Sequence, residues 1–500
     1  MTGSSPGYLI STLEVLSALF IFIVGAVVAG LIVLCIVDVV QTKHAIRRNY
    51  PIIGHFRYFF EWLGAYFRQY FFAMDREELP FNRAERSWIY RAAKGLDNIV
   101  AFGLTRDLRR PGAVVFMNCL FPTLGEDAVP ALPITIGPYC RKPYTTSALF
   151  NISAMSYGAI SKPAVLALSN GARIAGAWLK TGEGGVSPHH LHSGGDLVFR
   201  IGTAKYGVRS DDAELDDGLL GTVAAHDNIK MIELKLSQGA KPGKGGILPG
   251  KKVTHKIAQI RGIPMGCDSI SPNRHPDIDN IFELLDLLAH MRDVTGNPVE
   301  FKTVLGASGW LDELFAEVVR SGDQSAPDFI TIDGGDGGTG AAPMSLIDDV
   351  GLTLKESLAM LVDALDRYGL RSRTRVVASG KLITPANVAW ALCMGADFVA
   401  SARGNMFALG CIQSLQCNKN TCPTGVATHD PRLQRGLVPE QKAQRVANYV
   451  ANINPEVGVI AHSCGVEEPR QLRRHHARMI LQSGSSASLS DLYRDVSTSV

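Results

Sequence analysis

The sequence predicts an α/β fold, a (β/α)8 barrel of the TIM type that is preceded by one N-terminal transmembrane helix. Short β-branched runs alternate with helical patterns between residues 145 and 430, as in proteins built on a parallel sheet. Polar and glycine-rich residues follow many of these runs, where an α/β barrel carries its active site. A 23-residue run without a charge stands near the N-terminus. An open, doubly wound sheet is the alternative for the central region.

Composition narrows the class of protein. The chain has 500 residues, 46% of them hydrophobic, which is enough for a large core and excludes a wholly disordered chain. Its 50 Lys and Arg against 47 Asp and Glu give a net charge of +3, too balanced for a general nucleic-acid binder. The basic excess lies at 41–110, where 13 Lys and Arg stand against 7 Asp and Glu. We therefore expect no nucleic-acid partner, and a basic surface directly after the apolar run.

Residues Val15–Val37 predict the membrane helix. They carry no charge and would span about 34 Å as a helix, enough for a hydrocarbon core of roughly 30 Å. The alternative is a signal peptide cleaved near Ala29, but no basic residue precedes the run and the run is long for such a peptide. Lys43, Arg47 and Arg48 follow it. The positive-inside rule then predicts a single-pass protein of the cell (inner) membrane with a cytoplasmic catalytic domain.

An aromatic segment follows the predicted membrane helix. Between Tyr50 and Phe72, 11 of 23 residues are aromatic, and Arg57 and Arg68 are interleaved with them. This mixture is typical of a segment in the lipid headgroup layer; packing of the rings on the catalytic domain is the alternative. The predicted organisation is an anchor at 1–42, a basic aromatic juxtamembrane region at 43–114, a catalytic barrel at 115–435, and a C-terminal helical extension with a flexible tail at 436–500.

Seven strands and four helices of the barrel can be placed from the pattern. The strands are Asn151–Met155, Ala177–Lys180, Lys230–Leu236, Val299–Leu305, Asp328–Asp333, Arg375–Ser379 and Asp397–Ser401. The helices are Ile281–Arg292, Leu311–Arg320, Thr353–Tyr368 and Pro385–Met394. Residues that suggest chemistry come directly after strands: Ser156, Thr181–Gly185, Gln238–Lys241, Gly334–Gly340, Gly380 and Arg403. Because the carboxyl ends of barrel strands meet at one face, we expect these residues to form one site.

Two glycine-rich loops are candidates for binding a phosphate or a flavin ring. Asp333–Gly340 and Lys241–Gly246 each follow a strand. Glycine lets backbone N–H groups approach a ligand closely. Neither loop fits the Walker pattern, and tight turns on an ordinary barrel are the alternative.

Three of the nine cysteines are close together in the sequence. Cys411, Cys417 and Cys422 fall within twelve residues, and Pro423 follows the last. Clustered thiolates of this kind are typical of iron–sulfur ligation. Zinc, with His429 as a fourth ligand, and unligated thiols are the alternatives. Most of the other six are expected to be small buried apolar groups in a reduced compartment.

Taken together, these segments resemble the FMN-binding synthase domain of glutamate synthases over roughly residues 115–435. The matching motifs are Ser153–Gly158, Lys180–Gly185, Lys235–Gly243, Leu248–Val253, Arg261–Pro264, Asp333–Ala341 and Cys411, Cys417 and Cys422 with the residues up to Thr428. The resemblance implies a membrane-anchored, stand-alone synthase domain with FMN and a three-iron (3Fe-4S) cluster as cofactors. The cluster would pass electrons to FMN, and reduced FMN would deliver hydride to 2-iminoglutarate made from 2-oxoglutarate and ammonia.

The resemblance also implies roles for single residues. The cluster would be bound by Cys411, Cys417 and Cys422. The catalytic residues would be Lys241 and Gln238, which would face the flavin and the substrate, and Glu183 at the entrance for ammonia. The substrate would be bound by Arg261, Lys241 and Ile247, with Arg261 holding a carboxylate. FMN would contact Ser153, Ala154, Met155, Ser156, Gln238, Lys302, Asp333, Gly334, Gly335, Ser379, Gly380, Ala402 and Arg403.

Three positions depart from the pattern of that family. Ile247 stands where the family has a glutamine that contacts the substrate, Lys244 where it has an acidic residue, and Asn273–Pro276 where it has a histidine-rich stretch. Nothing in the sequence resembles a glutamine amidotransferase domain or a nicotinamide- or FAD-binding domain. Ammonia would then come from a glutaminase or another source, and electrons from a partner protein or a quinone.

The sequence therefore predicts a membrane-anchored FMN and iron–sulfur oxidoreductase of the glutamate synthase type, of the class that acts on CH–NH2 donors. It would aminate 2-oxoglutarate, or a related 2-oxo acid, in glutamate and amino-acid biosynthesis. One alternative is a flavin and iron–sulfur oxidoreductase that acts on another substrate and exchanges electrons with a membrane partner. The other is a non-catalytic redox-sensing scaffold. Lys241, Arg261 and Glu183 favour an enzyme, whereas Ile247 favours drift in the substrate site.

Overall fold

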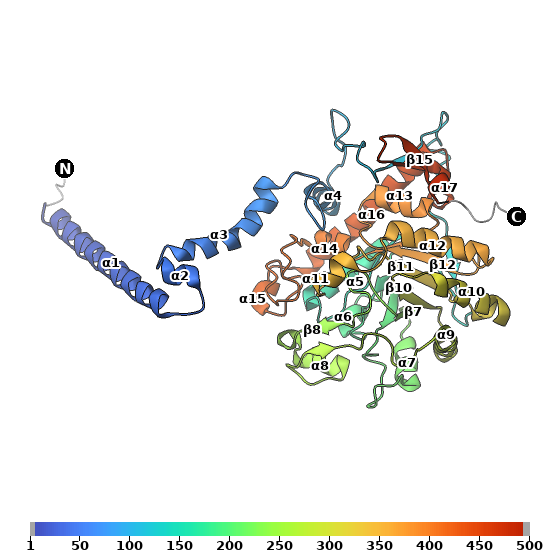
Figure 1. Cartoon of the computed structure of the whole chain (residues 1–500), viewed down its shortest axis with the longest axis horizontal. Helices are drawn as coiled ribbons and strands as arrows, with labels where there is room; N and C mark the ends of the chain where they lie inside the picture. Colours follow the sequence, from blue (N-terminus) through green and yellow to red (C-terminus); the bar gives the residue numbers. More distant parts are fainter. Residues whose placement is uncertain (1–5, 494–500) are drawn as a thin grey trace. The chain divides into compact units, whose positions relative to one another are not determined.

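The computed structural model describes residues 6–493, and the chain divides after Arg83 into two compact units. The first unit contains α1 (Pro6–Val40), α2 (Ala45–Asn49), α3 (Gly54–Phe67) and a π-helical turn, η1 (Arg68–Phe72). The second unit, from Ala84 onward, contains the barrel (Figure 1).

The predicted apolar helix is present as α1. Its segment Ile10–Val40 has a mean hydropathy of 3.2 in its most apolar window, and none of that window is buried in protein. By length and composition it can cross a membrane, but a signal sequence near the N-terminus satisfies the same criteria. At its end, Asp38 accepts hydrogen bonds from the Ile52 N–H and from His55 Nε2, both at 2.9 Å. These bonds tie the end of α1 to the start of α3.

Eight parallel strands close into a barrel, in the order β4–β5–β6–β7–β10–β11–β12–β13, with β13 paired back to β4. They are β4 (Phe150–Ile152), β5 (Leu179–Lys180), β6 (Leu197–Ile201), β7 (Ile229–Lys235), β10 (Val299–Thr303), β11 (Phe329–Asp333), β12 (Arg375–Ser379) and β13 (Phe398–Ser401). The predicted (β/α)8 barrel is confirmed, and the open sheet is excluded because the strands close on themselves.

Strand β6 is the one barrel strand that the sequence pattern did not predict. All five of its residues are buried, including Arg200, whose Nε donates to the Glu233 carboxylate on β7. In the sequence, the charged Arg200 interrupts a short apolar run, and such an interruption is read as the end of a strand. Its partner lies on a neighbouring strand 33 residues away, so only the folded barrel supplies the pairing that makes its burial tolerable.

Helices cover the outside of the barrel (Figure 1). They are α5 (Lys162–Ala175), α7 (Asp217–Ala224), α9 (Ile281–Thr295), α10 (Gly309–Ser321), α12 (Leu354–Arg367), α13 (Pro385–Cys393) and α14 (Arg403–Leu409). The four predicted helices are confirmed as α9, α10, α12 and α13. A long helix, α16 (Pro439–Ser463), packs along α5. Gly171 permits this close approach, because a Cβ there would lie 2.6 Å from the Cβ of Val446.

The amino-terminal end of the barrel is closed by a hairpin. The hairpin consists of β2 (Ile134–Ile136) and β3 (Tyr144–Thr146). Ile136 and Tyr144 pack in one buried cluster with Trp178, Phe329 and Phe398, which begin or directly precede barrel strands. Ligands are therefore excluded from the barrel axis at this end.

A small sheet contains one strand that precedes the barrel in the sequence and two strands that follow it. In it, β14 (Ala477–Ile480) pairs antiparallel with β1 (Val114–Phe116) and with β15 (Ser486–Ser488). The serine-rich end thus forms β15 and α17 (Leu489–Leu492), and residues 494–500 of the predicted flexible tail lie outside the described residues.

The remaining elements are α4 (Arg83–Ala93), α6 (Pro188–Leu191), β8 (Ile247–Leu248), η2 (Gly250–Lys252), α8 (His255–Arg261), β9 (Ser269–Ile270), η3 (Asp323–Ser325), α11 (Met344–Asp349), α15 (Pro431–Gln434), η4 (Pro469–Gln471) and η5 (Arg474–His476).

Candidate functional site

The residues that follow the barrel strands meet at the carboxyl end of the barrel. The Gly239 N–H donates to Asp333 Oδ2 at 2.9 Å, and Gln238 Nε2 donates to Thr339 Oγ1 at 3.1 Å, so the loops after β7 and β11 are in contact. The loop after β5 packs on the loop after β4: a Cβ on Gly182 would lie 2.4 Å from the Ser156 nitrogen. The parallel barrel thus brings these sequence-predicted residues together.

Glu183 lies in this site as a carboxylate held by a lysine. Lys235, the last residue of β7, donates to the Glu183 carboxylate and, at 3.2 Å, to Gln238 Oε1. Burial by itself raises the pKa of Glu183, but the charges of Lys235 and Lys241 outweigh it and bring that pKa to about 2. Glycines make room for the side chain, since a Cβ on Gly246 would lie 2.4 Å from Glu183 Oε1. At neutral pH Glu183 therefore accepts hydrogen bonds and holds no proton.

Arg261 brings a buried guanidinium to the same site from the end of α8. Its Nη1 donates to Ser269 Oγ at 3.1 Å and its Nη2 to Ser156 Oγ at 3.5 Å, while its Nε has no hydrogen-bond partner. The guanidinium carbon lies 5.2 Å from the centroid of the Tyr206 ring. Gly184 leaves it space, because a Cβ there would lie 2.7 Å from Nη2.

No carboxylate neutralises this guanidinium. Arg261 is only 5% exposed, and within residues 6–493 it forms no ion pair. Burial lowers its pKa, and the nearby charge of Glu183 acts in the opposite direction. A buried charge without a partner costs several kcal/mol, about 3–5 when a partner is removed from a buried pair. The arrangement is therefore suited to an anionic ligand that supplies the missing partner.

Lys241 is a second buried cation in the site. The residue is 4% exposed, and within residues 6–493 its Nζ reaches only the Gly245 carbonyl oxygen, at 3.4 Å. Burial lowers the pKa of Lys241, while the charge of Glu183 raises it. Because Lys235 already pairs with Glu183, the site contains more positive than negative charge.

Ile247 lies in the hairpin of β8 and β9. It pairs with Ile270, and its neighbour Leu248 pairs with Ser269, the residue that supports Arg261. The Ile247 side chain is half-buried and has no hydrogen-bonding group. The position predicted to contact the substrate is therefore apolar, and it directly precedes the residue that pairs with Ser269.

The residues assigned to FMN line the same end of the barrel. Lys302 pairs with Asp333 at 2.8 Å, and burial lowers the pKa of Lys302. The Gly334 N–H donates to the Ser379 carbonyl at 3.0 Å and the Gly335 N–H to the Leu352 carbonyl at 2.7 Å. These two glycines therefore already use their N–H groups within the fold.

A phosphate at this end would thus depend on the remaining assigned groups. They are the backbone of Gly380, which has a φ of 125°, and Ala402 and Arg403 at the start of α14. Ser153, Met155 and Ser156 are buried on the loop after β4, and Ala154 is half-buried there. Assignment of these residues to FMN stays a prediction.

The three clustered cysteines lie in the loop after α14, near two cations. Arg403 Nη1 lies 3.9 Å from Cys417 Sγ, and Lys252 Nζ donates to the Cys417 carbonyl at 3.2 Å. Burial lowers the pKa of Lys252 to about 8, with the Cys417 and Cys422 thiols acting in the opposite direction, and burial raises the pKa of Cys411 to about 11. Positive charge beside sulfur suits thiolate ligands.

The three thiols do not converge on a point where a single metal ion could bind. Among the residues that the structure describes, no group of three His, Cys, Asp or Glu side chains is placed to hold a metal ion. The donor chemistry of the loop therefore fits an iron–sulfur cluster, in which each thiolate binds a different iron. For the zinc alternative, His429 Nε2 lies 2.8 Å from the Gly158 carbonyl oxygen, and burial lowers the pKa of His429 to about 4, so its ring is neutral at pH 7.

Sequence reasoning missed four residues that shape the site: Lys235, Tyr206, Ser269 and Lys252. Lys235 ends a strand and could have been found by the same rule that found Gln238. Tyr206 lies in a loop and Ser269 in the short strand β9, neither within a motif, and the Ser269 Oγ and Tyr206 Oη are 2.9 Å apart. Their role as supports of Arg261 follows only from the folded arrangement.

Comparisons with known proteins show which family the chain is similar to. The profile of a family described as "Conserved region in glutamate synthase" matches residues 126–467. The "Glutamate synthase large subunit-like protein YerD" of Bacillus subtilis (strain 168) is 38% identical over 520 residues, which cover 96% of this chain and 98% of that protein. The archaeal-type glutamate synthase (NADPH) of Thermotoga neapolitana is 35% identical over 321 residues, which cover 64% of this chain and 60% of that protein. A solved structure of a mutant chimera of (S)-mandelate dehydrogenase is similar with a TM-score of 0.48 at 15% identity, covering 78% of this chain and 98% of that one.

Proposed function

The chain belongs to the glutamate synthase family, and on that premise we propose that it is an FMN- and iron–sulfur-dependent oxidoreductase that aminates a 2-oxo acid. The observation that carries the proposal is the buried Arg261, which has no carboxylate partner among the described residues and an unbonded Nε. Lys241 adds a second buried cation near the same Glu183 carboxylate. Two such cations suit a small dicarboxylate such as 2-oxoglutarate.

The residues of the site then have distinct tasks. Arg261 binds the substrate carboxylate, with Ser156 and Ser269 fixing its guanidinium. Glu183, ionised at neutral pH, accepts hydrogen bonds from ammonia and orients it. Lys241 places positive charge where negative charge develops during reduction of the substrate.

The cofactors would supply the redox chemistry. FMN, held by Ser153–Ser156, Gln238, Lys302, Gly380 and Arg403, would supply hydride, and a cluster on Cys411, Cys417 and Cys422 would supply electrons. Electrons would reach the chain from a donor protein or a quinone, and ammonia from a glutaminase or free ammonium. Relatives are named glutamate synthase (NADPH), and here NADPH would act through such a partner.

The test is reoxidation of the reduced chain. The full chain is purified anaerobically in mild detergent, its flavin is photoreduced, and 2-oxoglutarate with ammonium is mixed in. Reoxidation that needs both compounds, with glutamate as product, is expected. Reoxidation by a quinone analogue and by no 2-oxo acid would favour the second candidate, an oxidoreductase with another substrate and a membrane partner, for which the apolar Ile247 is the supporting observation.

Replacing Ile247 with Gln is expected to increase reoxidation by 2-oxoglutarate about ten-fold or more. An apolar side chain leaves a polar group of the substrate without a hydrogen bond, which costs roughly 1–3 kcal/mol. Single-turnover mixing of both proteins measures the change. Ile270→Gln is the matched control, because Ile270 pairs with Ile247 across the hairpin and is 65% exposed. A wild type that reacts fast and that Ile247→Gln slows would show that the site binds its substrate differently.

We further propose that α1 anchors the chain in the cell membrane with the barrel in the cytoplasm. The supporting observations are the apolar helix, the basic residues that follow it, and exposed aromatic side chains on α3 and η1 such as Phe56, Trp62 and Phe72. Protease added to intact cells is expected to leave residues beyond 110 intact. Digestion of that part from outside, or a mature chain that begins after Ala29, would exclude this topology.

A further inference from the structure

A second pocket lies at the end of the barrel opposite to the proposed catalytic site. It has a volume of about 670 Å³ and is lined by the start of β12, the residues before β13, and η4, η5 and α17. Arg375 is the first residue of β12 and Asp397 directly precedes β13, so both lie at amino-terminal strand ends. Arg261 and Lys241 lie at the carboxyl end, and the barrel core separates the two sites.

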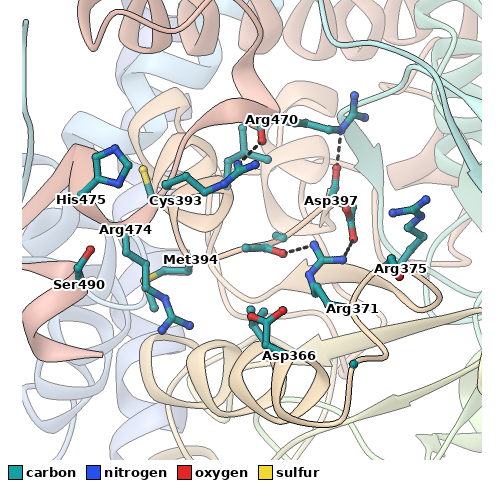
Figure 2. A pocket seen from close by; sticks show the side chains of 17 residues that line it. Asp366, Arg371, Arg375, Cys393, Met394, Asp397, Arg470, Arg474, His475 and Ser490 are labelled. Atoms are coloured by element: carbon teal, nitrogen blue, oxygen red, sulfur yellow. Dashed lines mark hydrogen bonds and ion pairs between the residues drawn. The ribbon is translucent and has the colours of Figure 1, made fainter. Parts of the chain in front are cut away.

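Five arginines line this pocket. They are Arg371, Arg375, Arg470, Arg473 and Arg474, and they come from two segments about a hundred residues apart in the sequence. Figure 2 shows Arg371, Arg375 and Asp397 on one side of the pocket and Arg474, His475 and Ser490 on the other. Among the described lining residues, two are acidic, Asp366 and Asp397. The lining therefore has an excess of positive charge.

Three of these arginines are fixed by carboxylates. Arg371 pairs with Asp397 at 3.0 Å, Arg470 with Glu468 at 3.6 Å, and Arg474 with Asp363. Arg470 also donates to the carbonyl oxygens of Asp397 and Leu132, both at 2.8 Å. These contacts hold the guanidinium groups in place before any ligand arrives, which reduces the entropy lost on binding.

The other two arginines, Arg375 and Arg473, have no carboxylate partner in the part of the chain that the structure describes. Arg375 makes one long hydrogen bond, from Nε to the Thr135 carbonyl at 3.4 Å. Arg473 donates from Nη1 to the carbonyl oxygens of Arg470 and Leu472, at 2.7 and 2.9 Å. Neither guanidinium is neutralised, so both can bind an anion through two N–H groups.

The charges around the pocket repel one another. Burial lowers the pKa of Arg470, the charges of Glu468 and Asp397 act in the opposite direction, and the charge of Arg375 lowers it further. The pKa of His476 is lowered by burial first, and then by His475 and Arg473. An anion in the pocket would relieve this repulsion.

We propose that this pocket binds a soluble phosphorylated metabolite of the size of a nucleoside diphosphate. Arginine forks match phosphate oxygens in pairs, and two unpaired forks suit a ligand with more than one phosphate charge. The volume falls in the range of small-molecule sites, about 300–1,000 Å³. Val362, Leu392 and Met394 offer apolar surface to the rest of the ligand. The ligand would join β12 and β13 of the barrel to the C-terminal segment.

The test is direct binding to the full, FMN-loaded chain in detergent at low ionic strength. The probes are ADP and inorganic pyrophosphate, with adenosine as the uncharged comparison, and calorimetry and the thermal midpoint are the readouts. Both phosphate probes are expected to bind and to raise the thermal midpoint, and adenosine is not. Arg375→Ala/Arg473→Ala is expected to weaken binding of both probes at least about ten-fold.

The controls separate the pocket from general charge effects. Arg109→Ala/Arg320→Ala removes the same charge from two exposed arginines outside the pocket and is expected to bind like the wild type. If the double variant does not fold, the single variant Arg473→Gln replaces it, because Arg473 is exposed and its substitution should not disturb folding. This variant is also expected to bind both probes more weakly than the wild type. Failure of both probes to bind the wild type, or equal binding by the pocket variants and the control, overturns the proposal.

Discussion

Replacing Arg261 with Met is expected to lower kcat/KM for the 2-oxo acid on the order of a thousand-fold, about 4 kcal/mol of transition-state stabilisation. The guanidinium is a buried positive charge without a carboxylate partner among the described residues, so its removal leaves a substrate carboxylate desolvated and unpaired. Steady-state turnover with the natural electron source, or single-turnover reoxidation by 2-oxoglutarate and ammonium, measures the loss.

The same substitution is expected to raise the apparent Tm in the absence of substrate. A buried charge without an ionic partner destabilises the folded state, and an apolar side chain of similar length removes that cost together with the unbonded Nε. Loss of activity with a gain in Tm distinguishes a binding residue from a structural one, whose loss would lower both.

Arg209→Met is the matched control for this prediction. The Arg209 guanidinium also lies over the Tyr206 ring, with its carbon 5.0 Å from the centroid, but it donates to the Gly262 carbonyl and is more exposed. It is expected to change kcat/KM by no more than a few-fold. Wild-type kcat/KM in Arg261→Met would show that the carboxylate binds elsewhere.

Replacing Cys417 with Ser is expected to abolish the iron–sulfur signal in electron paramagnetic resonance and, with it, electron transfer to the flavin. A serine hydroxyl is a far weaker ligand for iron than a thiolate. The Cys417 sulfur lies near Arg403, and its carbonyl accepts from Lys252, so the loop offers positive charge to a negatively charged ligand set. Iron and acid-labile sulfide assays on anaerobically purified protein measure the loss.

Cys267→Ser is the control for thiol loss, because Cys267 is exposed and lies outside the loop of clustered cysteines. It is expected to keep the signal. Among the described residues, no three side chains converge on a single metal ion, so the assays test a cluster in which each thiolate binds its own iron. Absence of iron and sulfide from the wild type would make the ligand assignment wrong and would favour unligated thiols.

The sequence by itself determined the class of fold and placed several polar residues at the carboxyl end of the barrel. Alternation of strands and helices predicted the barrel, seven of its strands and four of its helices, because periodicity reports which residues are buried and in which direction the chain runs. The position of Glu183, Gln238 and Lys241 after strands was enough to place them at one end, because all strands of such a barrel point the same way. The apolar run was enough to predict α1.

Only the tertiary structure decided which groups pair. Strand β6 depends on the contact of Arg200 with Glu233, and Glu183 pairs with Lys235. The absence of a described carboxylate beside Arg261 could not be predicted from its motif. The arginine pocket combines residues near 371 with residues near 470, and β1 pairs with β14 across the whole barrel sequence. The physical reason is the same in each case: periodicity and spacing constrain burial along the chain, whereas the partner of a charge or a strand edge is fixed by contacts between segments far apart in sequence, which form only when the barrel closes.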